Sequence, residues 1–185
     1  MEEKMKRSLI VMVLITAVAT FSLLMSSLGE SKDMPFGGDK DVEFARSIWT
    51  AMEDYQEWPM RSGFYPGESP HGKVLRMYYN LLNVNGTPYH VIVKDNYGGS
   101  DATVAKVSDS PDEYLGAVTI MVQKEKGYDP DNDNWFWAKY LKNGELDKNA
   151  KGLLLAGRVA KGMNAGCIAC HKNAKNGDYL FSNDD

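Results

Sequence analysis

The stretch Cys167-Ile168-Ala169-Cys170-His171 decides how the rest of the chain is interpreted. Two thiols three positions apart, followed at once by a histidine, form the attachment signature of a c-type haem. Each thiol can add to one vinyl group of the porphyrin, so two thioethers pin the ring to one helical turn. His171 then lies beneath the iron, where an imidazole is the usual axial ligand. The motif therefore predicts one covalent haem c held by Cys167 and Cys170, with His171 on its iron.

Other uses of a Cys-x-x-Cys pair fit this sequence less well. A redox-active pair is typical of a βαβ context, which the pattern here does not predict. A zinc site needs two further ligands. Outside the motif the chain has no cysteine, and its remaining histidines are His71 and His90. A disulfide within the pair is the third alternative, and covalent haem is favoured over all three.

The composition is that of an ordinary folded protein. A length of 185 residues allows one domain with its own core. A hydrophobic content of 43% argues against a disordered chain. The net charge of -4 comes with no basic patch, so nucleic acid is not expected as a partner. No residue pattern identifies a redox partner protein.

The first thirty residues predict export. Three basic residues among the first seven precede an apolar run from Leu9 to about Leu28, and small residues allow cleavage after Gly29. This is the pattern of a secretory signal peptide. An uncleaved membrane anchor is the alternative, because about 20 apolar residues can span a bilayer. We expect a signal peptide over residues 1–29 and a periplasmic haem domain over residues 30–185.

The pattern between these ends predicts an α+β fold. Apolar residues recur at intervals of three and four from Asp39 to about Tyr55, which indicates an amphipathic helix. Strand patterns cover residues 74–83, 89–95, 115–123 and 135–141, with a shorter one at 103–107 and a loop at 108–113. Asn85-Gly86 is a hairpin signal. We therefore expect four or five antiparallel strands between an N-terminal helix and a C-terminal haem-attachment helix.

The turn-rich loop at residues 61–73 contains two aromatic residues, Phe64 and Tyr65. Aromatic side chains in such a loop can cover an apolar surface. Phe64 is therefore a candidate to lie over a haem face, and packing against the protein core is the alternative.

Six runs of residues extend over nearly the whole chain after residue 29. They are Gly63-Phe64-Tyr65-Pro66-Gly67-Glu68-Ser69-Pro70-His71-Gly72, Ile92-Val93-Lys94-Asp95-Asn96-Tyr97, Gly127-Tyr128-Asp129-Pro130, Asn134-Trp135-Phe136-Trp137-Ala138-Lys139-Tyr140, the haem motif itself and Asp178-Tyr179-Leu180-Phe181-Ser182. In this order, the runs resemble the cytochrome P-460 and cytochrome c prime-beta family. The resemblance implies a periplasmic homodimer with a curved antiparallel sheet, a single c-type haem and a five-coordinate iron. Members either oxidise hydroxylamine, with an extra lysine cross-link to the haem, or lack the link and bind nitric oxide or related ligands.

Lys94 matches the position of that cross-linking lysine. In a strand of period two it shares a face with His90 and Ile92, so it can face the haem; a solvated lysine on an edge strand is the alternative. Enzymatic members are expected to carry a carboxylate just before the first cysteine, and residues 161–166 contain none. Asp129, Asp131 and Asp133 lie in the loop before Trp135 and could substitute, although a solvated acidic loop is the simpler interpretation.

Three functions remain open at this point. The first is an open-site haem protein that binds, oxidises or reduces small nitrogen-oxide ligands such as nitric oxide and hydroxylamine, as an enzyme if Lys94 cross-links the haem. The second is an electron-transfer cytochrome with a six-coordinate haem. Its candidate sixth ligands are His90 and the methionines, including Met60, Met77, Met121 and Met163. The third is a haem-based sensor, which no additional domain supports. His71 is interpreted as structural.

Overall fold

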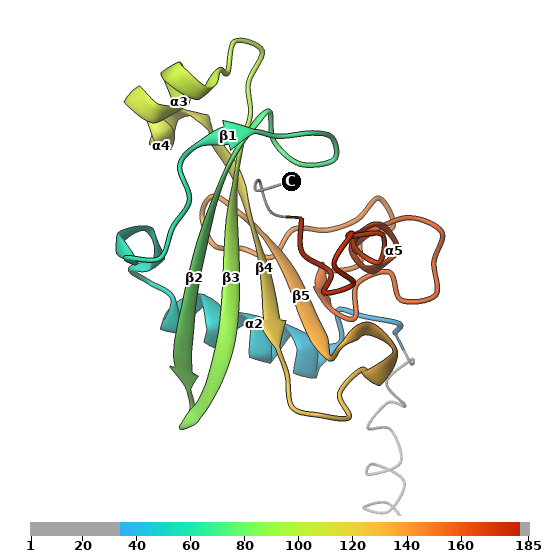
Figure 1. Cartoon of the computed structure of the whole chain (residues 1–185). Coiled ribbons are helices and arrows are strands. Elements are labelled where there is room, and N and C mark those ends of the chain that lie inside the picture. Colours follow the sequence, from blue (N-terminus) through green and yellow to red (C-terminus); the bar gives the residue numbers. More distant parts are fainter. Residues whose placement is uncertain (1–33, 182–185) are drawn as a thin grey trace, which may run out of the picture. The chain divides into compact units, whose positions relative to one another are not determined.

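The computed structural model describes residues 34–181. These residues form an α+β fold around a six-stranded antiparallel sheet with the strand order β1-β2-β3-β4-β5-β6 (Figure 1). The strands are β1 (Tyr65–Pro66), β2 (Val74–Val84), β3 (Thr87–Tyr97), β4 (Leu115–Gln123), β5 (Trp135–Leu141) and β6 (Ala156–Gly157). Each strand pairs with its neighbour in the chain, so the sheet is a meander. The predicted signal peptide lies outside the described residues.

Short helices complete the fold. They are α2 (Asp39–Ala51), α3 (Val104–Asp109), α4 (Pro111–Tyr114) and α5 (Cys167–His171), with 3₁₀ turns at Tyr55–Glu57 and Pro130–Asn132. The predicted fold class, the N-terminal helix and the C-terminal helix at the haem motif are confirmed. Within residues 34–181, no helix has the length and apolar character needed to cross a membrane.

Two predictions about single segments are wrong. Residues 103–107 were expected as a strand and 108–113 as a loop, but the chain forms α3 and α4 there. The Thr103 hydroxyl accepts a hydrogen bond from Lys106 N at 3.3 Å, which caps α3, and Pro111 opens α4. Residues 135–141 were expected as the last strand, but the two-residue β6 follows and pairs with Trp137 and Ala138.

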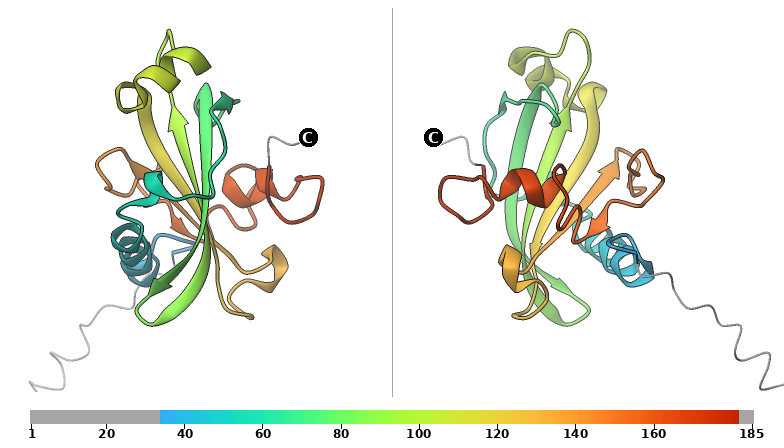
Figure 2. Two further views of the ribbon diagram at one scale, coloured as in Figure 1. Left: turned by 60° about the vertical axis from the view of Figure 1, so that its left-hand side comes forward. Right: turned by 90° about the vertical axis from the view of Figure 1, so that its right-hand side faces the viewer.

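The two faces of the sheet carry different layers (Figure 2). On one face, Ala45 and Ile48 of α2 and Met52, which follows the helix, pack with buried side chains of β2 to β5, Val93 and Ile120 among them. On the opposite face, Ile168 of α5 belongs to a second core cluster. This second cluster contains Met77, Ile92, Met121, Trp135, Trp137 and Tyr179. The period of two along each strand divides the residues between the faces.

Asp95 of β3 lies on the α2 face and is fully buried. It accepts hydrogen bonds from the hydroxyls of Tyr55 at 2.7 Å, Tyr97 at 2.8 Å and Tyr78 at 3.1 Å. Burial raises the pKa of this carboxyl group, and the three hydroxyl donors oppose that rise. The cluster ties the 3₁₀ turn after α2 to β2 and β3.

Candidate functional site

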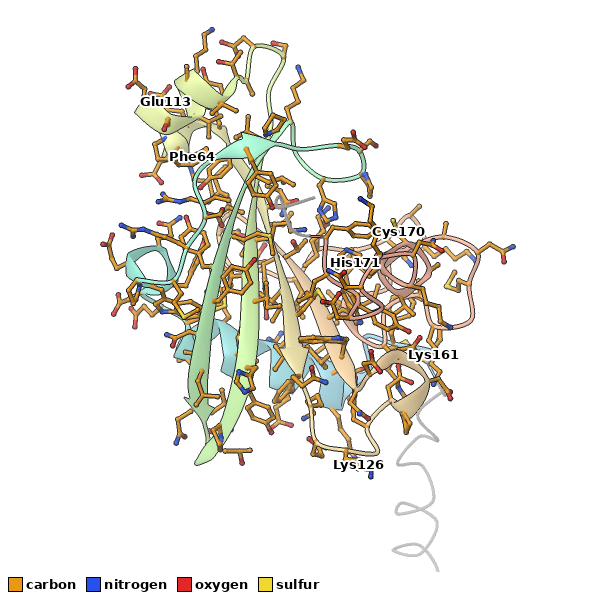
Figure 3. The ribbon with its side chains drawn as sticks, in the orientation of Figure 1. Phe64, Glu113, Lys126, Lys161, Cys170 and His171 are labelled. Atoms are coloured by element: carbon orange, nitrogen blue, oxygen red, sulfur yellow. The ribbon has the colours of Figure 1, made fainter. Side chains whose placement is uncertain are left out.

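Helix α5 presents the three residues of the haem motif within little more than one turn, next to the sheet (Figure 3). Cys167 is half-buried, Cys170 is exposed, and both are free thiols. Burial raises the pKa of the Cys167 thiol to about 11, so it is protonated near neutral pH. Cys167 and Cys170 are three positions apart on α5, so they occupy neighbouring positions on one side of the helix, as attachment to a single ring requires.

His171 is buried and has a fixed tautomer. Its Nδ1 donates a hydrogen bond to the carbonyl oxygen of Tyr179 at 2.7 Å. A carbonyl can only accept, so the proton is on Nδ1, and Nε2 carries a free lone pair. Burial lowers the pKa of His171 to about 4, although the Tyr179 bond partly offsets this effect. The Trp137 ring packs against the imidazole with 4.7 Å between the ring centroids. The neutral ring is thus oriented to offer Nε2 to a metal.

A cavity of about 40 Å³ lies between α5, the sheet and the segment after α5 that carries Leu180 and Phe181. Its walls are mainly apolar. They consist of His71, Met77, Ile92, Lys94, Thr119, Ile120, Met121, Trp137, Ala138, Cys167, His171, Leu180 and Phe181. The indole Nε1 of Trp137 is buried and finds no acceptor among the described residues.

Lys94 brings a cation into this cavity. On β3 it pairs across the sheet with Met77 of β2 and Thr119 of β4, and its neighbour on the same face is Ile92. Only 8% of its surface is exposed, and within residues 34–181 its ammonium group has no hydrogen bond or ion pair. Burial lowers the pKa of Lys94. The solvated edge-strand alternative is therefore wrong, because β3 is an interior strand and Lys94 is buried.

His71 was interpreted from the sequence as structural, yet it lines the same cavity. It lies in the loop between β1 and β2, and its ring centroid is 6.1 Å from that of His171. Its Nδ1 contacts Asn96 Oδ1 at 2.8 Å. Burial is the main cause that lowers the pKa of His71. No spacing in the sequence links positions 71 and 171; the loop brings them together only in the folded chain.

Several other predicted residues lie outside the cavity. Phe64 packs against Tyr97, with the guanidinium of Arg76 over its ring at 4.6 Å, and Figure 3 shows it beside β1. Its role as a cover over the haem stays a prediction. Among the candidate sixth ligands, Met60 and Met163 are exposed, and so is His90.

The acidic loop is held by a lysine instead of facing the cavity. Asp129 is fully buried and forms a salt bridge with Lys161, and Lys161 also contacts Asp131 at 3.1 Å. Asp129 accepts a further hydrogen bond from Asn132 Nδ2 at 2.8 Å. None of the three aspartates considered from the sequence lines the cavity. Through Lys161, Asp129 and Asp131 fasten the segment before α5 to the loop before β5.

Comparison with known protein families gives one match. The family model described as Cytochrome P460 matches residues 52–182, which include every residue of the cavity wall. The chain belongs to the cytochrome P460 family. No curated protein and no solved structure matches it. As a member of this family, the chain is a haem-binding cytochrome.

The side chains of this cytochrome P460 suit the group that the family implies. Cys167, Cys170 and the Nε2 atom of His171 are the groups that a c-type haem needs, and two thiols beside an apolar wall are suited to a porphyrin. A space of about 40 Å³ is smaller than a porphyrin, so the walls must separate to admit it. The segment that carries Leu180 and Phe181 is held by several contacts: Trp135 Nε1 donates to Asp178 O at 3.2 Å, His171 Nδ1 donates to Tyr179 O at 2.7 Å, and the Tyr179 hydroxyl lies 3.2 Å from both Asp131 O and Asn132 Oδ1.

Proposed function

We propose that this cytochrome P460 carries one covalent haem c and binds or converts small nitrogen-oxide ligands on an open side of the iron. Cys167 and Cys170 would form the two thioethers by addition of S–H across the vinyl groups, and His171 would be the axial ligand. The observation that carries the proposal is the hydrogen bond from His171 Nδ1 to Tyr179 O, because it leaves Nε2 free beside the cysteine pair. When bound, the haem supplies the iron that takes up the ligand and exchanges electrons with it.

Optical spectroscopy of the purified protein tests this proposal. We expect a high-spin spectrum and binding of carbon monoxide and nitric oxide to the ferrous form, because a five-coordinate iron has a vacant position. A low-spin spectrum that does not respond to these ligands would contradict it. The covalent link is tested separately: wild-type protein should keep its haem after denaturation, and the Cys167→Ser/Cys170→Ser variant should release it.

Oxidation of hydroxylamine is the enzymatic form of this function, and it depends on Lys94. Such a cross-link would replace one N–H bond of Lys94 and one C–H bond of the porphyrin by an N–C bond, so two electrons and two protons would have to pass to an external oxidant such as peroxide. The attacking nitrogen must also be neutral, and burial without a counter-ion among residues 34–181 lowers the pKa of Lys94 and favours this form. If the link exists, the wild type should be lighter by two hydrogens than the sum of its polypeptide and haem, Lys94→Ala should lack this deficit, and the ferrous Soret bands of the two proteins should differ. Identical bands in the two proteins would leave ligand capture as the function.

Electron transfer by a six-coordinate haem is the alternative function. Of the sixth ligands considered from the sequence, Met77 and Met121 line the cavity. The Met77 sulfur already accepts a hydrogen bond from the Tyr79 hydroxyl at 3.4 Å, so Met121 is the better candidate. A low-spin spectrum that becomes high-spin in Met121→Leu would establish this alternative.

Export and assembly complete the proposal. A cleaved signal peptide over residues 1–29 and a periplasmic location agree with attachment of haem to a Cys-x-x-Cys-His motif, and a homodimer is proposed from the family resemblance alone. The N-terminal residue of the mature protein, cell fractionation and light scattering test the three points separately.

A further inference from the structure

His71 reaches the cavity from an element other than those that carry the haem motif. The loop between β1 and β2 projects over the face of the sheet on which α5 lies (Figure 1). A side chain at Gly72 would collide with the backbone of Tyr97, so glycine allows this loop to lie directly on β3. Gly67 N also donates to Lys73 O at 2.8 Å. The loop therefore holds His71 in one place.

The neighbours of Asn96 fix the proton on His71. Asn96 Nδ2 donates to the carbonyl oxygen of Lys94 at 2.8 Å and to Thr119 Oγ1 at 3.2 Å, and the Ala117 carbonyl lies at 3.4 Å. Because carbonyls accept only, the amide nitrogen must point toward them and Oδ1 toward His71. Asn96 Oδ1 is itself an acceptor, so the neutral His71 ring must carry its proton on Nδ1. Nε2 of His71 then carries a lone pair and forms no hydrogen bond with a described residue.

Two imidazoles with the same tautomer thus line one cavity, with 6.1 Å between their centroids. One lone pair, on His171, is assigned to the iron by the proposed function. The other, on His71, can accept a hydrogen bond from a ligand and cannot donate one. A lone pair attracts an N–H or O–H group and repels the electron-rich end of a ligand without hydrogen.

We propose that His71 lies on the open side of the iron and selects ligands that carry hydrogen, such as hydroxylamine, over ligands that can only accept hydrogen bonds, such as azide and carbon monoxide. This inference rests on the proposed function and specifies its ligand class. Asn96 acts as a positioning residue, because it keeps the proton off Nε2.

The experiment measures ligand affinities of the ferric holoprotein by optical titration at fixed pH without oxygen. In His71→Leu, a residue of comparable size that forms no hydrogen bond, we expect the affinity for hydroxylamine to fall about tenfold, as loss of one hydrogen bond predicts. The affinity for azide should stay equal or rise. His90→Leu is the matched control: His90 is exposed and outside the cavity, so both affinities should equal those of the wild type.

The carbon monoxide stretching frequency of the ferrous wild type is a second measurement that needs no variant. A frequency typical of a bound ligand without a hydrogen-bond donor is expected, and a frequency lowered by a donor would overturn the inference. An unchanged ratio of the hydroxylamine and azide affinities in His71→Leu would also overturn it, while ligand binding itself would leave the proposed function in place. A low-spin wild type that turns high-spin in His71→Leu would make His71 an iron ligand and would overturn both.

Discussion

The two faces of the sheet differ in the hydrogen-bond partners that they give to a buried charged side chain. Two adjacent residues of β3, Asp95 and Lys94, show this difference. Asp95, on the α2 face, accepts hydrogen bonds from three tyrosine hydroxyls. Lys94, on the α5 face, is buried to a similar degree but has no polar partner within residues 34–181. The indole Nε1 of Trp137, on the same face, is also buried and unpaired among those residues.

Unpaired polar groups in a protein interior cost free energy, so a fold keeps them where they serve a ligand. The α2 face contains a continuous apolar core and the hydrogen-bonded Asp95 cluster, and beside that core the Tyr128 hydroxyl is buried without a partner among residues 34–181. Within the same residues, the α5 face contains an unpaired amine, an unpaired indole and two imidazoles with unshared lone pairs. The buried charged group, which is paired on one face and unpaired on the other, therefore distinguishes the two faces.

The largest expected effect of a substitution is at Asp95. Asp95→Ala would leave the hydroxyls of Tyr55, Tyr78 and Tyr97 buried without their acceptor, so we expect a loss of about 3–5 kcal/mol in the free energy of unfolding. Urea denaturation measures this loss. Asp95→Asn keeps one acceptor oxygen and should lose less. If the alanine variant unfolds at the same urea concentration as the wild type, the cluster does not stabilise this face.

Alkaline pH should reduce the stability that the Asp95 cluster contributes on the α2 face. Burial and the nearby charge of Asp95 raise the pKa of Tyr55, Tyr78 and Tyr97, that of Tyr78 to about 12. Tyrosines in the unfolded chain ionise near pH 10. Their contribution to stability is therefore complete below pH 10 and is lost as the pH rises through about 12, by roughly 2–3 kcal/mol for Tyr78. Phenolate absorbance and circular dichroism, followed together, should show these tyrosines ionising only as the protein unfolds. If these tyrosines ionise completely near pH 10 while the protein is still folded, their pKa values are not raised, and the Asp95 cluster does not make this contribution to stability.

A smaller effect is expected at Lys161, which holds the segment before α5. Lys161→Met would remove the ion-pair partner of the buried Asp129, while Asn132 would remain as a hydrogen-bond donor. We expect a loss of about 1–2 kcal/mol, because Lys161 itself is partly exposed and screened by solvent. Lys161→Arg, which keeps the charge, is the control in the same denaturation experiment. Equal stability of both variants would mean that the ion pair does not fasten the α5 segment.

The smallest effect on stability is expected at Lys94 itself. Lys94→Met removes a buried amine without a partner and replaces it with an apolar chain of similar length, so stability should change by less than about 1 kcal/mol or increase. The comparison with Asp95→Ala in the same apoprotein preparation is the sharpest test of the two faces. A loss at Lys94 as large as that at Asp95 would show that the α5 face depends on its charge for folding.

Much of the fold could be predicted because local patterns and tertiary structure agree. The alternating runs at residues 115–123 and 135–141 coincide with β4 and β5 to the residue. The segment at 103–113 failed because β-branched Thr103 and Val104 resemble a strand, whereas the Thr103 cap and Pro111 favour helices. The two-residue strands β1 and β6 have no periodicity to detect.

The site divides in the same way. Cys167, Cys170 and His171 form one short motif in the sequence. The period of a strand places Lys94 on the same face as Ile92. The motif and the position of Lys94 on its strand could therefore be predicted from the sequence. The contact between His71 and Asn96 could not be predicted, because it joins a loop to a strand 25 positions away. Only hydrogen-bond partners in the folded chain distinguish His71 from an ordinary loop histidine.

The meander order of the sheet has a consequence for the assembly of the protein. Every strand pairs with the one before it in the sequence, and such local contacts form quickly. If the chain is exported as proposed, β1 to β5 can therefore pair on the far side of the membrane before α5 emerges. The part of the cavity wall that the sheet contributes then exists before Cys167 and Cys170 arrive, so the proposed haem can be captured against a preformed surface.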